Sequence, residues 1–107
     1  MFITWYYKIS NNLNDKVYIN CSTKPEDTWE KMKDKTLSVL PDSPIIRIIK
    51  EIGVKNFQFV ILFSKLVDDQ TEKETLAELI DDYDCMKPNG YNYRKAIPAY
   101  KQTKKKQ

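Results

Sequence analysis

The side chains that could do chemistry in this sequence are tyrosines, lysines and carboxylates, because histidine is absent. Without imidazole there can be no Ser-His or Cys-His nucleophile pair, no histidine general base and no histidine-ligated zinc. Two cysteines, Cys21 and Cys85, are too few for a four-ligand zinc site. We expect both to be reduced, structural thiols.

The C-terminal end is the most basic part of the sequence. Residues 94–107 hold six of the 18 basic residues and no acidic one, so residues 1–93 hold 12 basic against 15 acidic residues. Such a tail is attracted to phosphates by counterion release, which makes DNA a possible partner; a disordered, solubilising end is the alternative. The basic residues of the tail are Arg94, Lys95, Lys101, Lys104, Lys105 and Lys106.

The length and composition are those of one globular domain. With 107 residues, 41% hydrophobic and 31% charged, we expect a domain at residues 1–93 followed by the tail at 94–107. The longest apolar run, residues 57–63, is far shorter than the roughly 20 residues that span a bilayer. The N-terminus shows no secretory signal pattern, so we expect an intracellular protein, cytoplasmic or nuclear, with no membrane partner.

Three segments have the pattern of β-strands. Residues 2–9 alternate between two faces and are rich in aromatic and β-branched types. Residues 11–15 favour a turn and residues 16–20 resume the strand pattern, which together predict a hairpin. A third strand is predicted at residues 57–62; because both of its faces are nearly apolar, we expect it to be central or covered.

Three helices are predicted between and after these strands. The first spans about residues 25–33, the second 44–53 and the third 71–82, with capping boxes that open at Thr23 and Thr71. The second is expected to end at its final glycine, where a left-handed residue costs least. The order β-β-α-α-β-α predicts an α+β fold with a small antiparallel sheet.

Four short motifs in this order resemble the GIY-YIG nuclease superfamily. WYYKISN at 5–11 and KVYIN at 16–20 resemble its two signature strands, and IIKEIGVKNF at 48–57 resembles its second helix leading into its third strand. PNGYN at 88–92 resembles a motif near the end of the domain. The resemblance covers residues 3–93 and implies a three-stranded antiparallel sheet flanked by about three helices.

The resemblance implies phosphodiester hydrolysis as the activity of the family. Its members combine a tyrosine from each signature strand, an arginine on the first helix and a glutamate that holds one divalent metal, Mg²⁺ or Mn²⁺. In such a site the metal polarises a phosphoryl oxygen, the guanidinium neutralises developing charge and a tyrosine positions or deprotonates water. The implied tyrosines are Tyr7 and Tyr18, and a late asparagine of the family corresponds to Asn92.

The other positions of the family's site carry different residues here. Trp5 and Asn20 replace the glycines of the two signature strands, Thr28 falls at the position of the arginine, and Leu76 falls near that of the metal glutamate. Losing one preorganised donor costs about 10²- to 10³-fold in rate, and an arginine acting on a phosphoryl group is worth about 10³- to 10⁵-fold. We therefore expect a catalytically impaired or inactive domain with no bound metal or other cofactor.

Nearby residues offer a rearranged site. Lys24 and Lys31 lie on the same helical face as Thr28, although lysine lacks the bidentate fork of arginine. Three glutamates of the third helix could supply a carboxylate to a metal; a solvated helix face paired with lysines is the plainer interpretation. These glutamates are Glu72, Glu74 and Glu78.

The sequence leaves three functions open. The first is a GIY-YIG-like domain without nuclease activity that retains nucleic-acid binding, through Lys24, Lys31 and the basic tail, or an interaction role. The second is an active, metal-dependent DNA endonuclease that uses Tyr7, Tyr18, Lys31 and a helix-borne glutamate. The third is a protein-interaction scaffold, which the acidic body favours. Candidates for stacking on bases, with core packing as the alternative, are Trp5, Tyr6 and Trp29.

Overall fold

A computed structural model describes residues 1–39, 41 and 43–92, so the predicted basic tail at 94–107 lies outside the described residues. The elements follow the expected order β-β-α-α-β-α, with one short 3₁₀ helix added. They are β1 (Phe2–Asn11), β2 (Val17–Ser22), α1 (Pro25–Lys35), α2 (Pro44–Ile52), η1 (Val54–Asn56), β3 (Phe57–Val67) and α3 (Asp69–Asp82). The predicted α+β class is confirmed.

The sheet has three antiparallel strands in the order β2-β1-β3, so β1 is the central strand. The apolar third strand is not central, because β3 is an edge strand; it is covered in part, since residues 59–62 are half-buried and Phe59 and Leu62 pack against the two core clusters. β1 is long enough to pair with both neighbours, and its Tyr6, Tyr7 and Ile9 are fully buried. The burial that we expected for β3 therefore belongs to β1.

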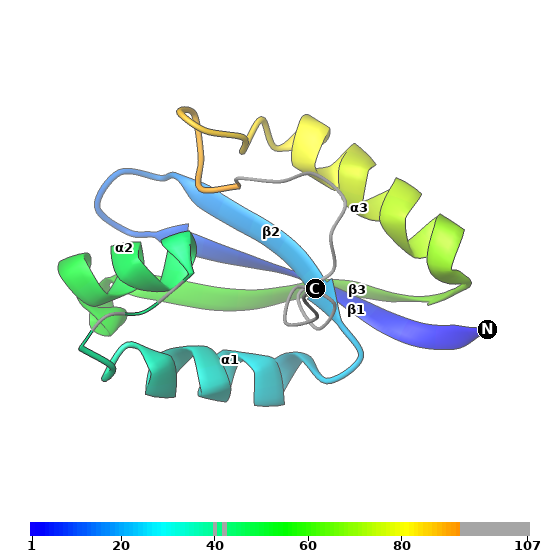
Figure 1. Ribbon diagram of the computed structural model, residues 1–107. Coiled ribbons are helices and arrows are strands. Elements are labelled where there is room, and N and C mark those ends of the chain that lie inside the picture. The colour runs from blue at the N-terminus through cyan, green and yellow to red at the C-terminus, as the bar shows by residue number, and fades with distance from the viewer. Residues whose placement is uncertain (40, 42, 93–107) are drawn as a thin grey trace, which may run out of the picture.

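Helices cover both faces of the sheet, with α3 on one side and α1 and α2 on the other (Figure 1). Tyr7 packs with Ile49 of α2 in one buried cluster, whereas Tyr6 packs with Leu76 of α3 in a second. Successive residues of a strand point to opposite faces, so two neighbouring tyrosines serve two cores.

The two predicted capping boxes are wrong. The residue before α1 is Lys24, which forms no side-chain cap; its own backbone N–H donates to Ser22 Oγ at 3.0 Å. At α3 the carboxylate of Asp68 accepts from the N–H of Thr71 at 2.7 Å, so the helix begins two residues earlier than predicted. Gly53 ends α2 with a φ of 109°, as predicted.

A segment after α3 closes the free edge of β2. The Asn92 side chain accepts from the N–H of Ile19 at 2.9 Å and donates to the carbonyl of the same residue at 2.8 Å. The N–H of Tyr91 donates to the carbonyl of Val17 at 2.9 Å. Gly90 lets this segment pass close to Cys85, because a Cβ at this position would stand 2.5 Å from the Cα of that residue. The edge of β2 is thus satisfied without a further strand.

Cys21 and Cys85 are both buried and neither forms a disulfide, as expected. Burial raises the pKa of the Cys85 thiol to about 11, so this group stays protonated and unreactive near neutral pH. No helix in the described ranges is long and apolar enough to cross a membrane.

We predict that Gly90→Ala lowers the free energy of unfolding by about 1–3 kcal/mol, because the added methyl group pushes the segment off Cys85 and strains the Asn92 pairing with Ile19. Urea denaturation measures the change. Asn89→Ala, at the exposed neighbouring position, is the control. Equal stabilities for Gly90→Ala and the unmodified protein would contradict the close approach.

Candidate functional site

Tyr7 and Tyr18, the two tyrosines implied by the family, lie on neighbouring strands and on the same face of the sheet. Tyr7 pairs with Asn20 across the β1–β2 ladder, and Tyr18 pairs with Ile9 two residues away. Both tyrosines belong to the core cluster beneath α1 and α2. The structure therefore brings the two signature tyrosines together, within a packed core.

The hydroxyl of Tyr7 is enclosed. The side chain is fully buried, its ring centroid lies 5.0 Å from that of Phe59, and its oxygen has no hydrogen-bond partner among the described residues. Burial, followed by the nearby Tyr18 and Cys21, raises the pKa of Tyr7 well above its usual value of 10. This phenol cannot deprotonate water at neutral pH.

Asn20, which stands where the family has a glycine, fills space beside the tyrosines. It is buried, and its side-chain Nδ2 donates to the hydroxyl of Tyr18 at 2.7 Å. Its Oδ1 accepts from the N–H of Cys21 at 2.8 Å. The replacement thus adds a side chain that engages the hydroxyl of Tyr18.

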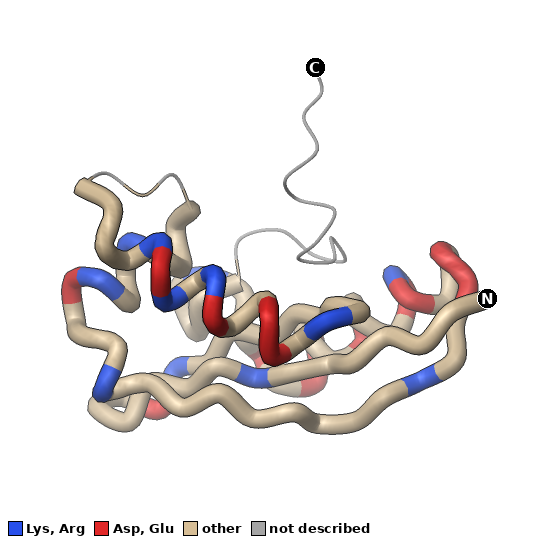
Figure 2. Tube along the Cα trace, turned by 90° about the horizontal axis from the view of Figure 1, so that it is seen from below, with Lys and Arg blue, Asp and Glu red and all other residues tan. Residues whose placement is uncertain are grey.

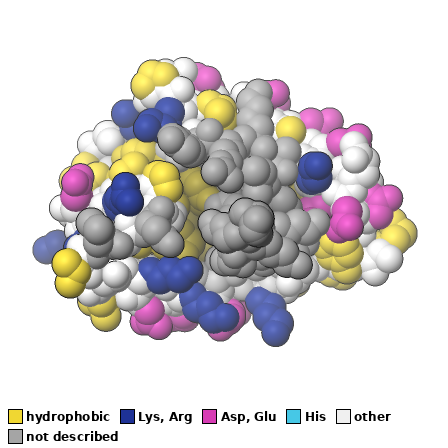
Figure 3. All heavy atoms as spheres, viewed as in Figure 1, with side chains coloured by type: hydrophobic (Ala, Val, Ile, Leu, Met, Phe, Trp, Pro, Cys, Tyr) yellow, Lys and Arg dark blue, Asp and Glu magenta, His cyan; other side chains and the backbone are white. Residues whose placement is uncertain are grey.

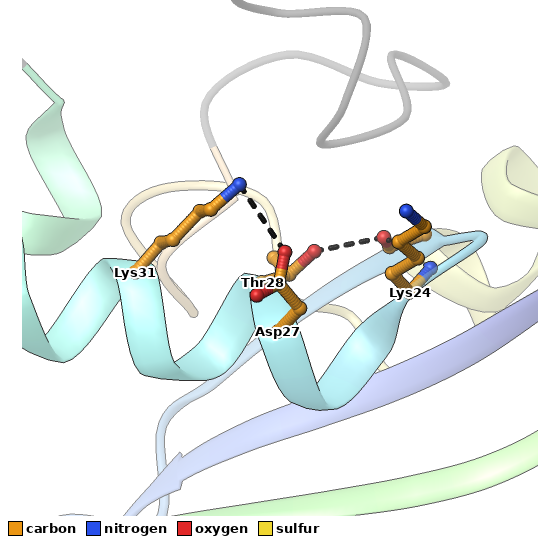
Figure 4. Close-up of polar contacts among 5 residues, drawn as sticks. Lys24, Asp27, Thr28 and Lys31 are labelled. Carbon is orange, nitrogen blue, oxygen red and sulfur yellow. Dashed lines mark hydrogen bonds and ion pairs between the residues drawn. The ribbon is translucent and has the colours of Figure 1, made fainter.

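Thr28, which the resemblance places at the position of the family's arginine, is also hydrogen-bonded within the protein. Its hydroxyl shares a hydrogen bond with the buried Ser22, with 2.8 Å between the oxygens (Figure 4). Lys24 and Lys31 lie on the same side of α1, one before and one after Thr28 (Figure 4). Lys31 pairs with Asp27 at 3.2 Å and is largely exposed.

The glutamates of α3 do not join the two signature tyrosines. Glu72 is fully buried near Tyr6, on the opposite face of the sheet from Tyr7, so it is not part of a solvated helix face. Its backbone carbonyl accepts from the hydroxyl of Tyr6 at 3.2 Å. Leu76, one turn later, is buried on the same stripe, which is why Glu72 faces inward. This i, i+4 spacing was a signal that the sequence already contained.

The remaining carboxylate candidates are exposed. Glu74 accepts from Gln70 at 2.8 Å, and Glu78 is also exposed. In the part of the chain that the structure describes, no group of three or more His, Cys, Asp or Glu residues could hold a metal ion. The resemblance implies a metal held by one glutamate; of the three candidates, Glu72 lies on the face opposite Tyr7, and Glu74 and Glu78 are exposed. Asn92, which the resemblance placed in the site, uses both its side-chain oxygen and its side-chain nitrogen in hydrogen bonds to the backbone of Ile19.

Two of the three aromatic candidates for base stacking are used inside the protein. Tyr6 packs on Phe63 with ring centroids 5.0 Å apart, and Trp29 stacks on Phe59 at 5.4 Å with an interplanar angle of 7°. Trp5 differs, because 37% of its surface is exposed. It lines a pocket of about 250 Å³ with Pro25, Glu26 and Ile61, a feature that the sequence analysis missed.

Charge is unevenly distributed over the surface. Acidic and basic residues alternate along α1 (Figure 2). The space-filling view shows lysines and acidic side chains next to one another over α1, and mainly acidic side chains over α3 (Figure 3). The exposed positions of α3 carry several carboxylates and a single lysine, Lys73. The surface of α1 therefore carries both signs of charge, whereas that of α3 is mainly acidic.

The strand order, the helices on both faces and the paired signature tyrosines define the fold of the GIY-YIG catalytic domain, as the motifs predicted. The chain is similar to two solved structures of one endonuclease. The first, the catalytic domain of the intron endonuclease I-TevI carrying a Glu-to-Ala substitution, is 25% identical with a TM-score of 0.74 and covers 92% of this chain and 100% of its own. The second, the catalytic domain of the homing endonuclease I-TevI, is 25% identical with a TM-score of 0.72 and covers 85% and 98%. No protein-family model and no curated protein sequence matches this sequence.

We predict opposite effects of removing the two signature hydroxyls. Tyr18→Phe leaves the buried Nδ2 of Asn20 without its acceptor and should cost about 1–3 kcal/mol of stability. Tyr7→Phe removes a hydroxyl without a described partner and should leave the stability unchanged or raise it by up to about 1 kcal/mol. Urea denaturation of both variants measures the difference. A larger loss of stability for Tyr7→Phe than for Tyr18→Phe would contradict this description of the site.

Stability should fall in alkaline solution. Burial raises the pKa of Tyr6 to about 12 and that of Tyr7 well above 10, so the folded state favours the neutral phenols. This contribution is complete below pH 10, the unfolded value, and is lost as the pH rises toward the folded values; the raised pKa of Cys85 acts likewise from about pH 9.

Absorbance at the phenolate band measures this ionisation. In the folded protein at about pH 11, Tyr6 and Tyr7 should remain neutral, whereas in denaturant all seven tyrosines of the chain should ionise near pH 10. Ionisation of all seven near pH 10 while the far-ultraviolet circular dichroism stays native would contradict the burial of these two phenols.

Proposed function

We propose that this chain is a GIY-YIG-type domain that binds nucleic acid without cleaving it. The observation that carries the proposal is the hydrogen bonding of the substituted positions: Thr28 bonds to Ser22, and Asn20 bonds to Tyr18. Where the family has a guanidinium and a glycine, this chain has short side chains engaged with their own neighbours. The fold and both signature tyrosines are retained, while other residues stand at the positions that the resemblance gives to the arginine and the metal glutamate.

The magnitudes favour a loss of cleavage over a rearranged active site. An arginine acting on a phosphoryl group is worth about 10³- to 10⁵-fold in rate, and a metal ion adds further stabilisation of charge. Lys31 is held by Asp27, and Glu72 lies on the other face of the sheet from Tyr7. The enclosed phenol of Tyr7 removes a third contributor.

Binding is supported by the fold and by exposed lysines at the start of α1 and along it. Both similar structures are catalytic domains of an endonuclease, so the shape suits a nucleic-acid ligand. Lys24 lies at the start of α1, beside the substituted site, and the exposed Lys31 follows two turns later. The sequence adds six basic residues at 94–107, which would contribute contacts to phosphates.

Incubation of labelled plasmid and single-stranded DNA with Mg²⁺ or Mn²⁺ tests cleavage, and a gel shift over a series of salt concentrations tests binding. We expect no nicking above the buffer blank and a DNA affinity that falls as salt rises. A charge-reversal variant, Lys24→Glu, should weaken binding about tenfold. Lys55→Glu, at an exposed position of η1, is the matched control.

Cleavage that is lost in Tyr18→Phe would overturn the proposal in favour of an active endonuclease with a rearranged site. If neither plasmid nor single-stranded DNA binds, nucleic acid is the wrong ligand and the scaffold role that the acidic body favours takes its place.

A further inference from the structure

A pocket of about 250 Å³ lies between the start of α1 and the sheet. Among the described residues, its lining consists of the apolar Trp5, Pro25 and Ile61 and the polar Glu26. Glu26 is exposed and forms no ion pair with another described residue. A flat, apolar group that carries a hydrogen-bond donor at its edge fits such a lining.

The pocket adjoins the substituted site. Trp5 pairs with Ser22 across the β1–β2 ladder, and Ser22 is the residue that bonds to Thr28. Lys24 comes two residues before Glu26 and is exposed at the start of the same helix. A nucleotide whose phosphate lies near Lys24 would therefore have its base within reach of Trp5.

Trp5 is suited to this role in a way that the other aromatic candidates are not. Trp29 is stacked on Phe59, and Tyr6 is fully buried against Phe63, whereas 37% of the surface of Trp5 is exposed. Stacking of a base on such a side chain is worth about 1–3 kcal/mol by alanine substitution, roughly 5- to 150-fold in affinity. Trp5 also replaces a glycine of the family's first motif, so the pocket is a feature of this chain.

We propose that this pocket receives one unpaired base that carries an exocyclic amino group, an inference that rests on the proposed nucleic-acid binding. The base stacks on Trp5 and donates an amino N–H to the carboxylate of Glu26. Carboxylates repel phosphates and base carbonyls but accept from the amino groups of cytosine, adenine and guanine, and thymine has none. A guanidinium or ammonium group would also suit an aromatic ring with a carboxylate, but the adjacent Lys24 repels it.

The test compares fluorescein-labelled oligodeoxycytidine and oligodeoxythymidine of about 15 nucleotides, which are equal in charge and ring size. At about 0.1 M salt, fluorescence anisotropy should show several-fold tighter binding of the cytidine oligomer. Trp5→Ala should weaken its binding about tenfold, and Glu26→Ala should abolish the preference over thymidine. Leu66→Ala is the matched control, because Leu66 is exposed on the same face of the sheet and lies outside the pocket.

A second measurement covers the case in which Trp5→Ala fails to fold. The oligodeoxycytidine should quench the tryptophan emission of the unmodified protein, and in Trp5→Phe, where Trp29 is the remaining tryptophan, most of the quenching should disappear. Equal binding by Trp5→Ala, a preference for thymidine, or quenching by an arginine-rich peptide in place of the oligomers would overturn the pocket assignment. If the unmodified protein binds no DNA at all, the proposed function fails together with it.

Discussion

The pleat of β1 is the constraint on which the rest of this structure depends. Tyr6 and Tyr7 are consecutive and both fully buried, so a single central strand must be covered on both of its faces. The α3 helix meets that need on the side of Tyr6, and α1 with α2 meets it on the side of Tyr7. Tyr7, one of the two signature tyrosines, is therefore a residue of the packed core.

The polar side chains at the substituted positions are hydrogen-bonded within the protein. An active phosphodiester site keeps polar groups unsatisfied until substrate arrives, which costs stability in a small domain. Here Asn20 and Thr28 are engaged with Tyr18 and Ser22, and the buried hydroxyl of Tyr7 remains as the exception. Trp5 and Lys24 are exposed and lie outside the packed core, so the proposed binding surface does not depend on the buried site.

Local features were predictable from the sequence, and pairing between distant segments was not. The order of elements, the hairpin and the end of α2 at Gly53 follow from short-range patterns. β3 is an edge strand because β1 pairs with both β2 and β3, and these pairings join distant parts of the sequence. The role of Asn92 depends on its contact with Ile19, 73 residues away. The spacing of Glu72 to Leu76 indicates burial of its side chain. Carboxylates are rarely buried in a protein core, however, so composition favoured an exposed Glu72.

The register of β3 has a consequence for solubility. Its partners skip one residue: Tyr7 pairs with Ile61 and Tyr6 with Phe63, so Leu62 is an extra residue in the ladder. A long apolar edge strand invites a second chain to add to it, and a bulge breaks the repeat that such an addition requires. Among the described residues, the outer edge of β3 is thus divided into two short lengths, with Lys65 in the second, and both features disfavour the addition of another strand.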